Sequence, residues 1–252
     1  MKISIITVVF NNKETIRRAI ESVLSQNYSN IEYLIIDGAS TDGTIDIINN
    51  YKNKINKFIS EKDEGIYDAM NKGIELATGD VVGILNSDDS YIDENSVSEI
   101  AKTFEKYNPD SVFADVIMVK EHDQKAIVRY YSAKKFKLWH FRFGHMPGHA
   151  TFFAKRELFD KLGKYDTKYK ISADFDLLLR FLFVNRISYK YIPKVLVRMS
   201  LGGVSTQGLS SIKQMNLELK HSLRKNRVKS NIIMIYMKYF VKIFQFALRP
   251  KS

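Results

Sequence analysis

The chain has no cysteine among its 252 residues, and this absence excludes disulfide bonds and thiolate-ligated metal sites. It also has no uncharged apolar run approaching the roughly 20 residues that are needed to span a bilayer. Met1 and Lys2 lead directly into a strand-like stretch, so we expect no signal peptide. These absences suit a reducing compartment, and we expect a cytoplasmic location.

The two commonest nucleotide-binding sequences are missing as well. The chain has neither Gly-x-Gly-x-x-Gly nor a Gly-Lys-Ser/Thr loop, which disfavours dinucleotide-binding and P-loop folds. No internal repeat and no low-complexity linker is present. Hydrophobic residues make up 45% of the chain, enough for a sizeable core in one large or two small domains.

Strand and helix patterns alternate through the first 115 residues. Such alternation predicts an α/β fold with a parallel, doubly wound sheet and right-handed crossovers. The expected strands are 2–10, 31–36, 58–59, 81–85 and 111–114, and the expected helices are 15–24, 44–51, 65–77 and 95–107.

The pattern is looser beyond residue 115. Alternation predicts a hairpin of 116–119 with 126–131, and residues 134–149 are aromatic and basic. Further elements are expected as a strand at 151–154, helices at 155–162 and 174–184, and a strand at 187–197. We therefore expect one α/β domain over residues 1–208, with a variable second half and a tail over 209–252.

Two polar segments directly follow predicted strands. The buried strand 81–85 leads into Asn86, Ser87, Asp88 and Asp89, and the strand 31–36 leads into Asp37. Ligands of open α/β sheets bind beyond the carboxyl ends of strands. Adjacent carboxylates there suit a hard divalent cation that also binds phosphate. The alternative is that these residues cap a helix or shape a turn.

Four segments together resemble the nucleotide-binding half of glycosyltransferase family 2, which has the GT-A fold. They are 5–11, 37–44, 69–74 and 86–89, and the run Gly-Ile-Tyr-Asp-Ala-Met-Asn at 65–71 is similar to bacterial enzymes that build surface polysaccharides. The resemblance implies a nucleotide-sugar-binding half over 1–115 and an acceptor half over 116–208. It covers residues 2 to 115 most strongly, and 145 to 205 less so.

The resemblance also implies roles for individual residues. It implies a nucleoside pocket lined by Asn11 and Asp37, donor contacts from Asp63, Asn71 and Asn86, and Asp88 and Asp89 as ligands of Mn²⁺ or Mg²⁺, with Asp88 also at the diphosphate. Three positions depart from the family pattern: Gly38 replaces a frequent second Asp, Met70 a common Arg, and Asn86 the first Asp of the metal motif.

The acceptor side carries two candidate bases at the start of one helix. Asp174 stands where the resemblance implies the general base, and Asp176 is the alternative; either carboxylate is also explained as a helix cap. His149, in a segment similar to one before the base in these enzymes, is a candidate diphosphate or acceptor contact, although a lone histidine is more often structural. Residues 202–206 are a candidate lid or a plain linker.

The tail carries most of the positive charge. Ten Lys and Arg residues against one acid, Glu218, give 209–252 a charge of +9, so about +2 of the total +11 is left for residues 1–208. A helix over 232–248 has a wide apolar face and a narrow polar stripe with Lys238, which favours a peripheral position on the anionic cytoplasmic face of the membrane. The alternative is packing on the catalytic domain or on a second subunit, as a homodimer.

The resemblance, together with these features, implies an inverting glycosyltransferase, either hexosyl- or N-acetylhexosaminyl-transferring. It would move a sugar from a nucleotide-diphosphate donor, expected to be a UDP-sugar, to a lipid-linked glycan of a capsule, O-antigen or exopolysaccharide. One alternative is a sugar nucleotidyltransferase, although residues 10–13 lack the Gly-rich, Arg-containing loop that such enzymes need. The other is a non-catalytic module that binds membrane or nucleic acid through the tail; we expect no nucleic-acid partner.

Overall fold

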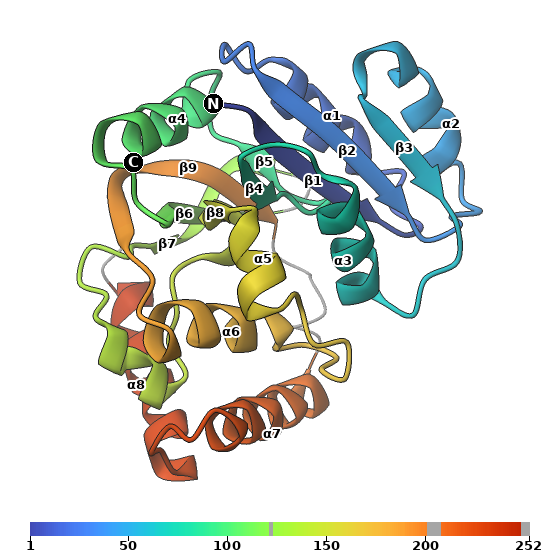
Figure 1. The fold of residues 1–252 in the computed structure, drawn as a ribbon. Coiled ribbons are helices and arrows are strands. Elements are labelled where there is room, and N and C mark those ends of the chain that lie inside the picture. The colour runs from blue at the N-terminus through green and yellow to red at the C-terminus, as the bar shows by residue number, and fades with distance from the viewer. Residues whose placement is uncertain (121–122, 201–207, 248–252) are drawn as a thin grey trace.

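The computed structural model describes residues 1–120, 123–200 and 208–247 (Figure 1). The candidate lid at 202–206 therefore lies outside the described residues. The first half follows the predicted alternation closely. Its elements are β1 (Ile3–Val9), α1 (Ile16–Leu24), β2 (Ile31–Asp37), α2 (Thr44–Asn49), η1 (Lys52–Lys54), β3 (Lys57–Ser60), α3 (Ile66–Leu76), β4 (Val81–Ile84), β5 (Ser90–Tyr91) and α4 (Ser96–Tyr107).

The second half confirms the predicted hairpin but joins two predicted strands into one. Residues 111–114 and 116–119 belong to a single strand, β6, and the predicted helix 174–184 continues as a π-helical segment after residue 178. The elements are β6 (Ser111–Lys120), β7 (Asp123–Tyr131), η2 (Leu138–Phe143), η3 (His149–Thr151), β8 (Phe153–Lys155), α5 (Glu157–Leu162), α6 (Ala173–Leu178), η4 (Leu179–Val184), β9 (Tyr189–Ser200), α7 (Leu209–Lys225) and α8 (Ile232–Ala247).

One sheet runs through the molecule in the order β3-β2-β1-β4-β8-β6-β9-β5, with β7 paired to β6. The strands β3, β2, β1 and β4 are parallel, so their carboxyl ends share one edge. The strand β8 is antiparallel to β4 and β6, whereas β9 is parallel to β6. The sheet is therefore parallel in the first half and mixed in the second.

Side chains on β1 alternate between the two faces of the sheet, as a doubly wound fold requires. Ile3 and Ile5 belong to a core with the buried residues of α1 and α4, whereas Ile6 and Val8 belong to a core with those of α3 and α6. Both faces are covered, which is why β1 consists of seven buried residues.

The tail consists of two helices that pack on different parts of the molecule. In Figure 1, α7 lies across α6 on the side away from the sheet, and Leu219 and Leu223 bury its inner face. The helix α8 contacts η2 and β7. Among the described residues, no helix is long and apolar enough to cross a membrane.

Candidate active site

The loops that follow β1, β2 and β4 are tied together at the carboxyl edge of the sheet. Asn12 donates from Nδ2 to Ser87 Oγ over 2.9 Å, and Thr15 Oγ1 donates to the Ser87 carbonyl over 2.7 Å. The N–H of Asn11 donates to Ser40 Oγ over 2.7 Å. The polar segments that the sequence singled out therefore form one continuous rim, where ligands of such sheets bind.

Asp37 is fully buried at this rim and is only half satisfied. Its Oδ2 accepts hydrogen bonds from the N–H of Ser40 at 3.0 Å and from Ser60 Oγ at 2.7 Å. Its Oδ1 has no hydrogen-bond partner among the described residues. A buried carboxylate oxygen without a donor is costly. This oxygen is suited to accept a hydrogen bond from a ligand such as a nucleoside.

Asp63 explains the departure at Gly38. A Cβ atom on Gly38 would lie 2.6 Å from Asp63 Oδ2, so the Asp63 carboxylate occupies the space that a side chain at position 38 would take. Asp63 Oδ1 accepts the N–H of Gly65 at 2.9 Å. Asn11 has a positive φ of 45°, and its Oδ1 accepts the N–H of Thr41 at 2.8 Å. Asn11, Asp37 and Asp63 thus belong to one loop cluster.

Asp88 and Asp89 differ in environment although they are adjacent. Asp88 is partly exposed, whereas Asp89 is only 1% exposed and neither of its carboxylate oxygens has a hydrogen-bond partner within normal distance among the described residues. Burial and the neighbouring Asp88 charge raise the pKa of Asp89 well above its usual range, against weaker opposing contributions from the Ser200 backbone and from Arg18.

The oxygens in this segment fit a hard cation. Asn86 Oδ1 is also buried without a partner in the described part of the chain, so three oxygens of Asn86 and Asp89 lack donors. A cation would relieve the repulsion that raises the Asp89 pKa. No group of three or more His, Cys, Asp or Glu residues that could hold a metal occurs among the described residues.

Asp174 has the environment of a general base. It lies in the first turn of α6, stays partly exposed, and accepts the N–H of Phe175 at 2.7 Å. Burial raises the pKa of Asp174 to about 6. Burial and, to a smaller extent, the charge of Asp174 raise the pKa values of Tyr67, Tyr131 and Tyr165. A carboxylate with this pKa is poised to accept a proton near neutral pH.

Asp176, the alternative base, is fully engaged in structural contacts. Its side chain is completely buried, with Oδ2 paired to Arg180 Nε at 2.9 Å. Its Oδ1 accepts from Ser222 Oγ at 2.7 Å and from Asn226 Nδ2 at 3.0 Å. These contacts favour Asp174 as the base and give Asp176 the task of holding α7 against α6.

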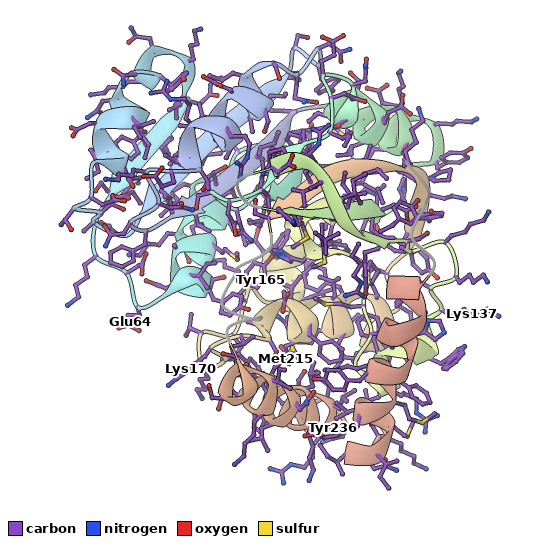
Figure 2. All side chains as sticks on the ribbon, turned by 180° about the vertical axis from the view of Figure 1, so that it is seen from behind. Glu64, Lys137, Tyr165, Lys170, Met215 and Tyr236 are labelled. Atoms are coloured by element: carbon purple, nitrogen blue, oxygen red, sulfur yellow. The ribbon has the colours of Figure 1, made fainter. Side chains whose placement is uncertain are left out.

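Asn71 and His149 meet at Tyr165 rather than at the rim. The Asn71 side chain donates to the Tyr165 carbonyl and accepts its N–H, both at 2.9 Å. His149 is buried, with Nε2 2.6 Å from the Tyr165 hydroxyl, and burial lowers the pKa of His149 to about 4. Figure 2 shows Tyr165 near the centre of the molecule, between α3 and α6. Both residues support this junction, and their donor contacts stay predictions.

Glu218 is a residue near the site that the sequence analysis did not single out. It is buried in α7, and its carboxylate accepts the backbone N–H groups of residues 170–172 at 2.9–3.0 Å, directly before Asp174. Figure 2 places Lys170 beside α7. Glu218 is the only acid in a tail with ten basic residues. That isolation was the signal that could have identified it.

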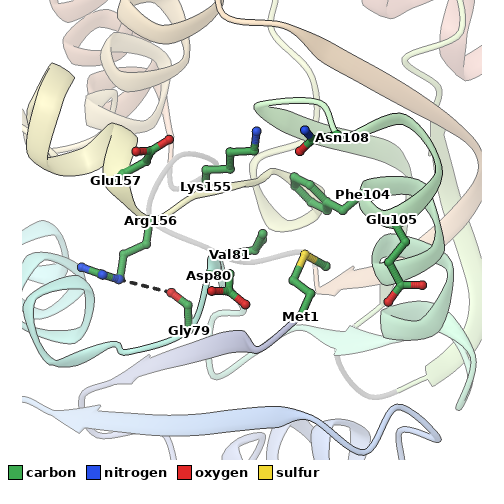
Figure 3. Close-up of a pocket in the computed structure, with 10 residues that line it drawn as sticks. All are labelled: Met1, Gly79, Asp80, Val81, Phe104, Glu105, Asn108, Lys155, Arg156 and Glu157. Atoms are coloured by element: carbon green, nitrogen blue, oxygen red, sulfur yellow. Dashed lines mark hydrogen bonds between the residues drawn. The ribbon is translucent and has the colours of Figure 1, made fainter.

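A pocket of about 630 Å³ lies at the opposite end of the strands (Figure 3). It is lined by the start of β4 and by charged residues of both signs, including Asp80 and Lys155. Arg156 Nε donates to the Gly79 carbonyl over 3.2 Å. This pocket is at the amino ends of β1 and β4, away from the rim.

Known sequences match most of this chain. The family model described as glycosyl transferase family 2 matches residues 4–163. A PGL/p-HBAD biosynthesis glycosyltransferase of Mycobacterium tuberculosis is 30% identical over 207 residues, which cover 80% of this chain and 78% of that protein. An uncharacterized glycosyltransferase of Rickettsia typhi is 28% identical over 240 residues, 92% of this chain and 74% of the relative.

Solved structures share the fold. The structure of S. aureus TarS 1–349 superposes with a TM-score of 0.69 at 16% identity, covering 100% of this chain and 76% of TarS 1–349. The structure of TarS 1–349 in complex with UDP-GlcNAc gives a TM-score of 0.68 at 17% identity, covering 88% of this chain and 66% of the TarS chain. The mannosyltransferase PcManGT from Pyrobaculum calidifontis, in complex with GDP-Man and Mn²⁺, gives a TM-score of 0.64 at 18% identity, covering 91% of this chain and 65% of PcManGT.

Proposed function

Because this chain belongs to glycosyltransferase family 2 and is a glycosyltransferase with the GT-A fold, we propose that it transfers a sugar from a UDP-sugar to a membrane-associated glycan, with inversion at the anomeric carbon. The family assignment argues against the two alternative functions, a sugar nucleotidyltransferase and a non-catalytic binding module. The glycan would belong to a surface polysaccharide.

The observation that carries this proposal is the environment of Asp174. Its carboxylate is partly exposed at the start of α6, with a pKa raised to about 6 by burial. At neutral pH it is ionised and can take the proton from the acceptor hydroxyl as that oxygen attacks the anomeric carbon. Inversion in one displacement needs a single base opposite the leaving diphosphate, and Asp176 is occupied by Arg180.

The rim would hold the donor. Asp37 offers its unpartnered Oδ1 to the nucleoside, beside Asn11 and Asp63. Support for a nucleotide sugar comes from the TarS complex with UDP-GlcNAc and from PcManGT with GDP-Man. Asn86, Asp88 and Asp89 would hold Mn²⁺ or Mg²⁺ with the donor phosphates, and PcManGT contains Mn²⁺. Such a cation neutralises charge on the leaving diphosphate.

The tail supports a location on the cytoplasmic face of the membrane. The exposed side chains Ile233, Tyr236 and Met237 give α8 an outward apolar face, and the tail carries a charge of +9. Anionic lipids attract such a segment.

Calorimetric titration with UDP, with and without Mn²⁺, tests the donor site. A sugar-transfer assay on the same variants tests the base. We expect metal-dependent UDP binding, which Asp88→Asn weakens at least tenfold. Asp174→Asn should bind UDP within about twofold of the wild type but transfer labelled sugar to lipid extracts about 10²- to 10⁴-fold more slowly. Failure of the wild type to bind UDP would contradict the proposed donor, and undiminished transfer by Asp174→Asn would remove it as the base.

A further inference from the structure

A second large pocket lies on the acceptor half of the molecule. Its volume is about 790 Å³, and it is bounded by the end of β7, the segment 132–146 and α8. This volume is typical of sites for small molecules. Its apolar and aromatic lining includes Tyr131, Phe136, Trp139, Met146 and Met237.

All the residues with a formal charge in the lining are basic. Lys134 and Lys135 are exposed on the segment after β7, and Lys238 faces the pocket from α8, where it is only 3% exposed. In the part of the chain that the structure describes, no Asp or Glu lines the pocket. An apolar space edged by cations alone is complementary to an amphipathic anion.

The pocket lies next to the candidate base. Aromatic rings connect its wall to α6, with Phe136 and Phe141 centroids 5.5 Å apart and Phe141 and Phe175 centroids 5.6 Å apart. Phe175 directly follows Asp174. Tyr131 lines the pocket, and its pKa is raised by burial and by the charge of Asp174. Packed aromatic rings therefore link the pocket wall to α6, the helix that carries Asp174 in its first turn.

The pocket also adjoins an apolar surface. On α8, Ile233 is 71% exposed, and the pocket residues Met237 and Trp139 are 48% and 50% exposed. Exposed apolar side chains gathered on one surface mark contact with a membrane or a partner. A hydrocarbon chain could pass from a lipid layer against this surface directly into the pocket.

We propose that this pocket binds the acceptor through a hydrocarbon chain that carries a phosphate or diphosphate. The chain occupies the aromatic lining, and Lys134, Lys135 and Lys238 bind the phosphate. The glycan that follows the phosphate would extend out of the pocket and would have to reach Asp174 for transfer. The identification of the bound molecule as the acceptor rests on the proposed function. Its chemical class, a hydrocarbon chain with a phosphate or diphosphate, is inferred from the lining of the pocket.

Trp139 is the only tryptophan in the chain and lines the pocket, so tryptophan fluorescence reports on the surroundings of this one side chain. We would titrate the full chain with geranyl diphosphate, geraniol and inorganic diphosphate in 0.15 M salt. EDTA would remove divalent metal, so that the diphosphate group does not bind through a metal at the Asp88 site. We expect a saturable change with geranyl diphosphate at a concentration at least tenfold below that needed for either fragment. Lys134→Glu/Lys135→Glu should weaken this binding at least tenfold.

Lys137→Glu is the matched control, because Lys137 is exposed, lies on the same segment and does not line the pocket (Figure 2). This substitution should change binding by less than threefold, since 0.15 M salt screens an exposed charge that does not contact the bound molecule. Equal binding of geraniol and geranyl diphosphate, or equal losses in both variants, would overturn the proposal. UDP titration of the same protein with Mn²⁺ and without EDTA separates the two ideas. UDP binding without geranyl diphosphate binding removes only the pocket, and the reverse removes only the proposed donor.

Discussion

At the scale of single residues, two aspartates on one helical turn have opposite environments. Asp174 keeps partial exposure and few partners, whereas Asp176 is completely buried against Arg180, Ser222 and Asn226. Removing one member of a buried ion pair is costly, because it leaves the other charge uncompensated. Asp176 is therefore held in a structural role, which leaves Asp174 as the candidate base.

The raised pKa of Asp174 predicts the pH dependence of transfer. A base works only when it is deprotonated, so kcat/KM should fall about tenfold per pH unit below about pH 6 and stay level above pH 7. The measurement is a pH–rate profile between pH 4.5 and 8. An acidic limb near pH 4, the usual range for an aspartate, would contradict this assignment.

Stability provides an independent control on the same residue. Because the folded pKa is above the unfolded value, the contribution of Asp174 to stability is full below about pH 4 and is lost as pH rises through about 6. Asp174→Asn removes the buried charge and should stabilise the fold by about 1–2 kcal/mol at pH 7, with allowance for partial exposure. Urea unfolding at pH 4 should show a much smaller difference.

At the scale of elements, α7 supports the segment that carries the candidate base. Glu218 accepts three backbone N–H groups in the segment directly before α6, and Ser222 reaches Asp176. These bonds fix the position at which α6 begins, and so the position of Asp174. A truncation that removes α7 would therefore disturb the base as well as any membrane contact.

Glu218→Gln should impair catalysis through Asp174. A glutamine keeps one acceptor oxygen but brings an NH₂ group against backbone N–H donors, so segment 170–172 loses part of its support. We expect kcat to fall at least tenfold with little change in UDP affinity. We also expect the acidic limb of the pH profile to move downward, because the Glu218 charge raises the pKa of Asp174.

Lys220→Gln is the control on the same helix, since Lys220 is exposed two residues away. It should leave kcat, the pH profile and stability unchanged. A loss of kcat in Glu218→Gln with an unmoved pH limb would show that Glu218 supports the fold without acting on the base.

At the scale of the whole molecule, α8 is turned with its apolar side outward. Lys238 and Ile235 face the protein, whereas Ile233, Tyr236 and Met237 are exposed. The prediction of a helix over 232–248 is confirmed, but the expectation that Lys238 belongs to a polar stripe at the membrane surface is wrong, because this lysine faces the pocket.

The exposed face of α8 predicts binding to anionic vesicles. We expect co-sedimentation with phosphatidylglycerol vesicles that weakens as salt rises, since charge contributes about 1 kcal/mol per basic residue near the surface. Ile233→Asp/Tyr236→Asp should weaken binding at least tenfold, because burial of each large apolar side chain contributes about 1.5–3 kcal/mol.

Leu217→Asp is the matched control, because Leu217 is similarly exposed, on α7. It should leave vesicle binding within threefold of the wild type. An equal loss in both variants would mean that α8 is not the contact surface. Binding that is indifferent to salt would contradict the electrostatic part of the proposal.

Local sequence pattern alone determined where the strands and helices of the first half lie. Apolar periodicity located its strands, and the rule that parallel strands share a carboxyl edge brought Asn11, Asp37 and residues 86–89 together before any contact was known. Such features depend on neighbours a few residues away, which the sequence displays directly. The family resemblance rests on the same segments, and the match over residues 4–163 confirms it.

Tertiary structure alone decided the environments of side chains in the second half of the chain and in the tail. The resemblance favours Asp174 over Asp176, but local pattern does not separate their environments. That difference arises from Ser222 and Asn226, which lie 46 and 50 residues from Asp176. The same holds for Glu218, and for Lys238, whose direction follows from the packing of α8 on η2 and β7. Burial and charge at these positions depend on residues remote in the chain, and only the folded chain brings those residues together.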